Sequence, residues 1–319
     1  MDLSNKRILV TGGNGFLGRY VVKQLIESGC NARPFAPTRS ECDLTDDHQT
    51  AAMFSSYQPE IVIHLAAAVG GIGKNMQHPG GLFLGNMRMG LNVLELSVAS
   101  GVEKFVYVGT VCSYPKFCEA PFKEEDLFVG YPEETNAPYG IAKRALGVGL
   151  QACKHEYGMD SAYVIPTNLY GPGDNFDPES SHVIPALIRK FKEANETGAA
   201  NVLVWGSGKA TRQFLHASDA ATAIVLAAQK ATDPSPINLG SGKQVRIREL
   251  AHMISSEIGF KGDILFGEDL PDGQPVREVL SQKASEILGW NPTIEFEKGL
   301  SDTISWFYEH ERSKEFANA

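Results

Sequence analysis

The chain has 319 residues, of which 43% are hydrophobic and 21% charged, the composition of an ordinary globular protein with one large or two smaller domains. Its net charge is -9 and Lys and Arg form no clusters, which argues against a nucleic-acid partner. No apolar stretch could cross a membrane and no signal-peptide core is present, so we expect no membrane partner and a cytoplasmic location. Five irregularly spaced cysteines argue against a disulfide framework, fit a reducing compartment and predict no metal site.

A glycine-rich turn follows the first predicted strand. Residues 7–10 (RILV) form a short apolar run typical of a buried parallel strand, and a helical pattern follows the turn as far as about Ser28. Gly12, Gly15 and Gly18 allow a tight turn and close approach of the backbone to a pyrophosphate at a helix N-terminus, and Gly13 gives a second register. The strand before the turn and the helix after it favour dinucleotide binding over an unoccupied glycine-rich turn.

The second predicted strand, near residues 32–35, bears on the choice of cofactor. It ends without the acidic residue that binds the ribose of NAD. Arg39 follows and could meet a 2′-phosphate, so the sequence favours NADP, with a solvent-exposed loop arginine as the alternative. Asp43 lies in the next loop, where we expect it near the adenine.

The third predicted strand, residues 61–65, leads into a turn of small residues. Ala66 and Ala67 would let the backbone approach the cofactor. His64 lies within the apolar run and is interpreted as a core histidine. The glycine-rich residues 69–81 that follow are predicted to be a flexible loop that contacts substrate.

The fourth predicted strand, residues 104–108, ends in polar residues. The carboxyl ends of strands are where a doubly wound sheet places its ligand contacts. Thr110 could hydrogen-bond a substrate carbonyl. Cys112 is either a small buried hydrophobic residue or a base whose pKa is lowered.

Residues 136–143 (NAPYGIAK) predict the first turns of a helix that ends near Tyr157. Tyr139 and Lys143 are four residues apart and would share one helical face. An ammonium beside a phenol should lower the pKa of the phenol, which would make Tyr139 a general acid or base. A surface pair without function is the alternative, and the upstream dinucleotide turn argues against it.

Strands alternate with helices as far as the fifth predicted strand, residues 162–165. This alternation predicts an α/β fold, a Rossmann-type doubly wound parallel sheet with helices on both faces. After Pro172 the pattern becomes mixed. We therefore predict a dinucleotide-binding domain over residues 1–171 and a smaller substrate-binding domain over residues 172–319, with some later segments returning to the first sheet.

These stretches resemble the extended short-chain dehydrogenase/reductase family. Within it, residues 166–176 (PTNLYGPGDNF) and 182–187 (HVIPAL) are similar to the branch that epimerises and reduces GDP-4-keto-6-deoxy-D-mannose with NADPH. The resemblance implies that Thr110, Tyr139 and Lys143 carry the reduction and that Cys112 and His182 exchange protons in the epimerisation. The GDP-sugar contacts it implies are Asn168, Lys190, Trp205, Arg212 and Arg277. The NADP(H) contacts it implies are Gly12, Gly15, Phe16, Leu17, Gly18, Arg39, Asp43, Leu65, Ala66, Ala67, Tyr139, Lys143, Pro166, Asn168, Leu169 and His182.

Some residues depart from that branch. Thr110 stands where a serine is usual, and Val111 and Ser113 also differ. The alternatives are therefore a reductase that does not epimerise, action on a related GDP-4-keto hexose or heptose, and a non-redox isomerase or dehydratase that retains its nucleotide. An NADPH-sensing scaffold is the alternative that is not an enzyme. The resemblance also implies a homodimer formed through the helices near residues 80–100 and 138–157.

Overall fold

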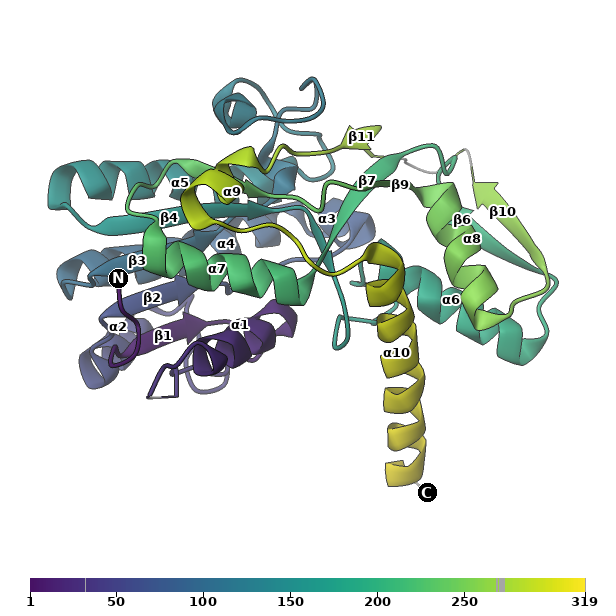
Figure 1. The fold of residues 1–319 in the computed structure, drawn as a ribbon, viewed down its shortest axis with the longest axis horizontal. Helices are drawn as coiled ribbons and strands as arrows, with labels where there is room; N and C mark the ends of the chain where they lie inside the picture. The colour runs from purple at the N-terminus through teal and green to yellow at the C-terminus, as the bar shows by residue number, and fades with distance from the viewer. Residues whose placement is uncertain (32, 268, 270–272, 319) are drawn as a thin grey trace.

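A computed structural model describes residues 1–319 except residues 32, 268, 270–272 and 319. A five-stranded parallel sheet lies at the centre of the first half of the chain (Figure 1). The strand order β1-β2-β3-β4-β8 shows that one strand from the second half of the chain completes this sheet. The strands are β1 (Ile8–Thr11), β2 (Ile61–His64), β3 (Lys104–Val108), β4 (Asp160–Pro166) and β8 (Pro236–Leu239).

Helices cover both faces of this sheet because both faces carry apolar side chains. Ile8 and Val10 of β1 lie in one core and Leu9 in the other, and the same alternation continues through the next three strands. Two helices, α1 and α7, pack together over the first face, while α2, α4 and α5 lie over the second. The predicted doubly wound fold is therefore confirmed. The helices are α1 (Phe16–Glu27), α2 (Asp47–Tyr57), α4 (Pro79–Ala99), α5 (Ala137–Tyr157) and α7 (Ala217–Lys230).

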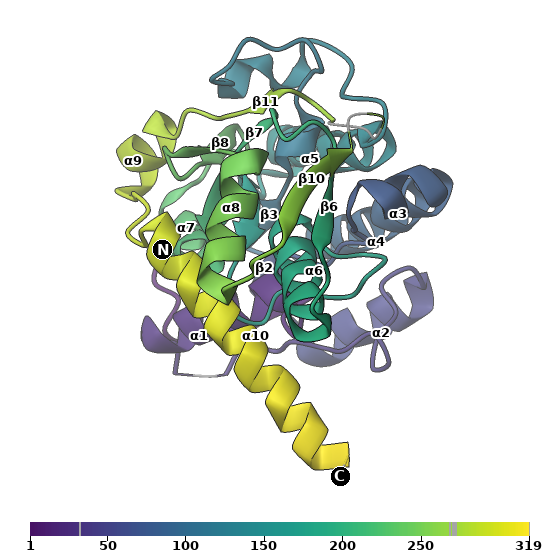
Figure 2. The same ribbon diagram turned by 90° about the vertical axis from the view of Figure 1, so that its right-hand side faces the viewer.

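The rest of the chain forms a smaller mixed assembly around a third apolar core. Two small sheets have the orders β11-β7-β5, with β9 antiparallel to β7, and β10-β6. The last helix, α10, extends away from the body in both views (Figures 1 and 2). A domain boundary near residue 171 remains a prediction. The elements are β5 (Asn168–Tyr170), α6 (Val183–Thr197), β6 (Asn201–Trp205), β7 (Thr211–His216), β9 (Gln244–Arg246), α8 (Ile247–Ile258), β10 (Asp263–Gly267), β11 (Val276–Arg277) and α10 (Phe296–Asn318). The short helix α9 (Gln282–Leu288) instead packs on α7 and β8 and contributes to the first core.

Two local predictions were wrong. The second predicted strand is only a bridge from Leu9 to Phe35, because Pro34 and Pro37 lack the N–H groups that a ladder needs; Ala32 lies outside the described residues. The loop predicted over residues 69–81 contains a short helix, α3 (Ile72–Gln77), and the first residues of α4. In the described part of the chain, no helix is long and apolar enough to cross a membrane.

Candidate active site

The turn between β1 and α1 leaves no room for side chains at its glycines. Gly12 has a φ of +71°, and a Cβ there would lie 2.8 Å from the backbone nitrogen of Ala66. A Cβ on Gly18 would lie 2.1 Å from the carbonyl oxygen of Gly12, so α1 packs directly on the turn. Gly15 is the N-cap of α1, whose first N–H groups have no intrahelical partner. The turn is therefore a cradle of the kind that holds a dinucleotide pyrophosphate.

The end of β2 lies beside this turn. Leu65 donates its backbone N–H to the carbonyl of Thr11 at 3.1 Å, and Ala66 abuts Gly12. Both alanines that follow Leu65 are partly exposed. The structure thus gathers one set of predicted cofactor residues at a single edge of the sheet: Gly12, Gly15, Phe16, Leu17, Gly18, Leu65, Ala66 and Ala67.

The structure also pairs Arg39 with Asp43. The Arg39 side chain is 85% exposed and its Nη2 lies 3.3 Å from Oδ2 of Asp43. Hydrogen bonds from the backbone N–H and the hydroxyl of Thr45 hold the pKa of Asp43 below its usual range. Asp43 is therefore a fixed carboxylate that orients Arg39, while the rest of the guanidinium stays open to a phosphate.

The end of β3 and the first turn of α5 bring together Thr110, Cys112 and Tyr139. Thr110 is the N-cap of the 3₁₀ helix η1 (Val111–Ser113), and its hydroxyl accepts a 3.2 Å hydrogen bond from the Cys112 N–H. The phenol of Tyr139 lies close enough to this hydroxyl for Thr110 to lower the pKa of Tyr139 and close enough to Cys112 for the sulfur to raise it. Gly140 permits this closeness, because a Cβ there would lie 2.4 Å from the carbonyl oxygen of Cys112.

The electrostatics of Tyr139 and Lys143 differ from the expectation. Burial raises the pKa of Tyr139, the nearby Cys112 raises it further, and the Thr110 hydroxyl offsets only part of the change. Burial also lowers the pKa of Lys143 to about 7. The prediction that Lys143 lowers the pKa of Tyr139 was therefore wrong, because desolvation of two buried groups favours the neutral form of each.

The predicted base, Cys112, faces a cation. Nη1 of Arg277 donates a hydrogen bond of 3.3 Å to the sulfur of Cys112. The resemblance had assigned Arg277 to the GDP-sugar, and the structure adds a contact that no sequence pattern indicated.

The predicted partner of Cys112 in epimerisation, His182, lies on a separate element. It is the N-cap residue of α6 and is exposed at the surface. Partial desolvation by the surrounding protein lowers the pKa of its imidazole. The chain just before it contacts the segment predicted to meet substrate, since the N–H of Gly71 donates to the carbonyl of Ser180 at 3.2 Å. The residues just before His182 therefore lie against residues 69–81.

Two predicted GDP-sugar contacts, Lys190 and Trp205, lie together. Lys190 of α6 donates a 3.1 Å hydrogen bond to the carbonyl of Leu203, and its ammonium lies 5.8 Å from the centre of the Trp205 ring. Trp205 ends β6 and is half exposed. An exposed indole beside an ammonium offers a stacking face and a positive charge, which suit a nucleotide.

The other predicted contacts lie on the small sheet that contains β5, β7 and β11. Arg212 of β7 is the register partner of Arg277 in β11. Asn168 of β5 donates a 3.1 Å hydrogen bond to the carbonyl of Gln213 in β7. Pro166 ends β4 and Leu169 lies in β5, so this group adjoins the carboxyl end of the central sheet.

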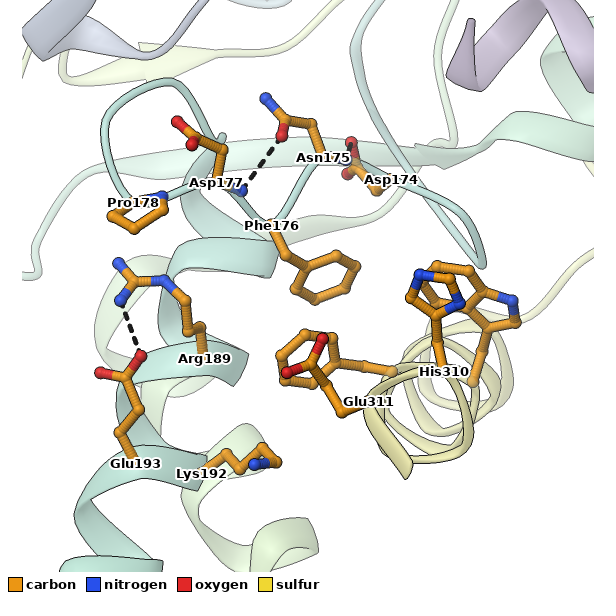
Figure 3. Close-up of a pocket in the computed structure, with 12 residues that line it drawn as sticks. Asp174, Asn175, Phe176, Asp177, Pro178, Arg189, Lys192, Glu193, His310 and Glu311 are labelled. Atoms are coloured by element: carbon orange, nitrogen blue, oxygen red, sulfur yellow. Dashed lines mark hydrogen bonds and ion pairs between the residues drawn. The ribbon is translucent and has the colours of Figure 1, made fainter. Parts of the chain in front are cut away.

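A separate hollow of about 500 Å³ lies between the loop after β5, α6 and α10 (Figure 3). Asp174, Arg189 and His310 are among its lining residues, and the Phe176 and Phe307 rings stack with their centres 4.2 Å apart. None of the Thr110, Cys112, Tyr139 and Lys143 group lines this hollow. Among the described residues, no cluster of His, Cys, Asp or Glu could hold a metal ion.

Two residues of the site gave no sequence signal. Gln274 accepts a hydrogen bond from Nε of Arg277, and it lies in a loop without a recognisable motif. Val108 contributes its main-chain carbonyl to Lys143 at 3.0 Å, a role that no side chain reveals.

The comparisons with known proteins agree with this geometry. Residues 8–240 match the NAD dependent epimerase/dehydratase family. A GDP-L-fucose synthase of Sinorhizobium fredii is 40% identical over 306 residues, which cover 96% of each chain. The crystal structure of a GDP-L-fucose synthetase from Naegleria fowleri bound to NADP has a TM-score of 0.87 at 30% identity, covering 98% of this chain and 97% of that chain. That of a GDP-6-OMe-4-keto-L-xylo-heptose reductase from C. jejuni has a TM-score of 0.90 at 28% identity, covering 97% and 99%. The chain therefore belongs to the NAD dependent epimerase/dehydratase family, within the extended short-chain dehydrogenases/reductases.

Proposed function

We propose that this chain catalyses the NADPH-dependent 3,5-epimerisation and 4-reduction of GDP-4-keto-6-deoxy-D-mannose to GDP-L-fucose. The observation that carries the proposal is the group of Thr110, Cys112 and Tyr139, in which a base for epimerisation adjoins a proton donor for reduction. Relatives with about 40% identity over nearly the whole chain are GDP-L-fucose synthases, which supports the same substrate.

The residues around the glycine turn fit NADP(H). The space above Gly12 and Gly18 is available only because these residues lack a Cβ, as a pyrophosphate requires. Arg39 would bind the 2′-phosphate, with Asp43 orienting its guanidinium. Lys143 would hold the nicotinamide ribose. When bound, NADPH supplies the hydride that reduces C4 of the sugar.

Epimerisation needs a base and an acid on opposite faces of the sugar, because one group acting alone would restore the original configuration. The C4 ketone acidifies the hydrogens at C3 and C5. Cys112, as thiolate, would remove one of these protons, and His182 would return a proton to the other face. The hydroxyls of Thr110 and Tyr139 would donate to the enolate oxygen, which places fixed dipoles where negative charge develops.

Reduction needs a proton donor at the C4 oxygen. Tyr139 would give its phenolic proton to that oxygen as the hydride arrives. Its raised pKa suits this role, because the phenol stays protonated at neutral pH until the reaction draws the proton away. The nearby Thr110 hydroxyl would then stabilise the phenolate that remains.

A second function is favoured by a specific observation. The structure also resembles a reductase of a GDP-linked heptose, and Thr110, Val111 and Ser113 depart from the usual pattern close to the predicted sugar site. Reduction of a related GDP-4-keto hexose or heptose without epimerisation is therefore the alternative. A non-redox isomerase that retains its nucleotide would need no stoichiometric NADPH.

The assembly we expect is a homodimer in the cytoplasm. Leu84 and Leu91 on α4 and Val148 on α5 are large apolar side chains left exposed on two helices that pack together. A second copy would cover them. Light scattering tests the dimer, and Leu91→Glu should shift the protein toward monomer.

The test of the proposed activity mixes purified protein, GDP-4-keto-6-deoxy-D-mannose and NADPH. The proposal predicts one NADPH oxidised for each GDP-L-fucose formed, identified by NMR. A reduced product with unchanged C3 and C5 would leave only the reductase. Turnover without consumption of NADPH would indicate an isomerase or dehydratase, and no turnover of any GDP-4-keto sugar would indicate a binding protein.

A further inference from the structure

The guanidinium of Arg277 is buried beside Cys112. Its Nη1 lies 3.3 Å from Sγ of Cys112, and Arg277 is only 7% exposed. Among the described residues, no carboxylate forms an ion pair with it. A guanidinium carries its charge at every physiological pH, so the thiol faces a permanent cation at hydrogen-bond distance.

The fold fixes Arg277 in this position. Its Nε donates a 3.2 Å hydrogen bond to Oε1 of Gln274, which is itself 4% exposed. The Gln274 amide donates in turn to the carbonyls of Pro115 and Lys116, each at 3.2 Å. These two carbonyls follow η1, the short helix that carries Cys112. Gln274 therefore ties the cation to the same chain segment as the sulfur, which fixes the distance between the guanidinium and the sulfur.

Of the charged and titratable groups around Cys112, Arg277 is the one that contacts the sulfur directly. Tyr139 faces it from α5 as a neutral phenol whose pKa is raised by burial. Glu133 is near enough to Arg277 to interact with its charge, and hydrogen bonds from Thr135 and Asn136 occupy its carboxylate. Nη1 of Arg144, from α5, is directed to main-chain carbonyls: those of Leu127 and Gly130 at 2.9 and 2.8 Å, and that of Ser113 at 3.5 Å.

We infer that Arg277 is a positioning residue that stabilises the thiolate of Cys112. The thiol gives its proton to solvent, and the hydrogen bond from the guanidinium to sulfur becomes charge-assisted and stronger. A cation beside a cysteine favours the thiolate, which is the form able to remove a proton from carbon. The inference deepens the proposed function and rests on it for the use of the thiolate, but the thiolate is a property of the free protein.

The test measures alkylation of each cysteine by iodoacetamide across a pH series, with peptide mass spectrometry to separate them. Burial raises the pKa of Cys118 to about 11, so Cys118 serves as an internal reference that should react slowly near neutral pH. In Arg277→Met, the alkylation rate of Cys112 near neutral pH should fall about tenfold or more relative to wild type, because the anionic sulfur loses the positive charge beside it.

Arg277→Lys guards against a general loss of structure, because it keeps the charge and should move the Cys112 profile less than Arg277→Met does. Circular dichroism and the Cys118 profile should be the same in all three proteins. An unmoved Cys112 profile in folded Arg277→Met would overturn the inference. Weaker GDP binding by calorimetry, with that profile unmoved, would instead make Arg277 a nucleotide contact only.

The same variant also distinguishes an error in the thiolate inference from an error in the proposed reaction. Arg277→Met should lower kcat for exchange of substrate hydrogens with solvent more than it raises KM. If wild type exchanges no substrate hydrogens but the alkylation profile depends on Arg277, the thiolate inference holds and the assigned reaction does not.

Discussion

The ammonium of Lys143 donates a 3.0 Å hydrogen bond to the main-chain carbonyl of Val108, the last residue of β3. This bond fastens α5 to the strand just before Thr110, so the spacing between the helix and the strand end is fixed from within the core. The aromatic ring of Tyr107 lies 4.9 Å from the same ammonium and offers it a second weak partner. Burial nevertheless dominates and lowers the pKa of Lys143 to about 7.

Lys143→Met should raise stability at low pH. Native Lys143 holds its proton only below about pH 7, whereas the unfolded chain holds it to near pH 10.5. Between these values the unfolded state binds more protons, so the stability of wild type relative to the variant should rise with pH by at most about 1.4 kcal/mol per pH unit. Urea unfolding across this range should therefore show a stability advantage for Lys143→Met that is largest below pH 7 and shrinks toward pH 10.5. An advantage independent of pH, or none at all, would contradict the burial of a titrating ammonium.

Tyr139→Phe should lose reduction while it keeps the cofactor. Removal of the proton donor should lower the rate of NADPH oxidation by about 10²- to 10⁴-fold, the range of a positioned acid. NADPH fluorescence titration should give a dissociation constant close to that of wild type. Near-normal turnover in this variant would remove Tyr139 from the mechanism.

Gly140→Ala should disturb the site through a single methyl group. The new Cβ would lie 2.4 Å from the carbonyl oxygen of Cys112, so η1 must move away from α5. We expect a loss of about 1–3 kcal/mol in the free energy of unfolding, as for overpacking of a core. Loss of epimerisation should accompany it.

Gly85→Ala is the matched control in α4, because its Cβ would meet only the Ala68 methyl at 3.8 Å. Alanine is the better helix former, so this variant should gain up to about 1 kcal/mol. Equal effects of the two substitutions on thermal unfolding would argue against the tight contact at Gly140.

Arg39→Ala should change the choice of cofactor. Loss of a charge-assisted hydrogen bond to a phosphate should lower kcat/KM for NADPH by about ten- to a hundredfold. The value for NADH, which has no 2′-phosphate, should change little. Arg33→Ala removes another exposed arginine nearby and should leave both values as in wild type. A parallel decrease for NADPH and NADH in Arg39→Ala would show that Arg39 does not bind the 2′-phosphate.

Much of the fold could be predicted from the sequence because its signals are local. The apolar run that forms β1, the glycines after it and the spacing of Tyr139 and Lys143 each depend on neighbours in the chain. His64 was correctly interpreted as a core residue: it shares a 2.7 Å hydrogen bond with Thr11, and burial lowers its pKa to about 3.

The electrostatics of the site could not be predicted, because they depend on contacts between distant segments. Spacing alone suggested that Lys143 would act on Tyr139, but it contains no information on the burial that governs both groups. The contact between Cys112 and Arg277 joins residues 165 positions apart. Gln274, which holds Arg277, lies in a loop whose path only the folded chain defines.

The most direct test of the account is the reaction of GDP-4-keto-6-deoxy-D-mannose with NADPH in D2O, with the product examined by NMR. If Cys112 and His182 exchange protons at carbon before Tyr139 protonates oxygen, the product is GDP-L-fucose with deuterium at both C3 and C5. Cys112→Ser should then give a reduced product without this label. A fully reduced wild-type product that carries no deuterium at C3 or C5 would contradict epimerisation by this site.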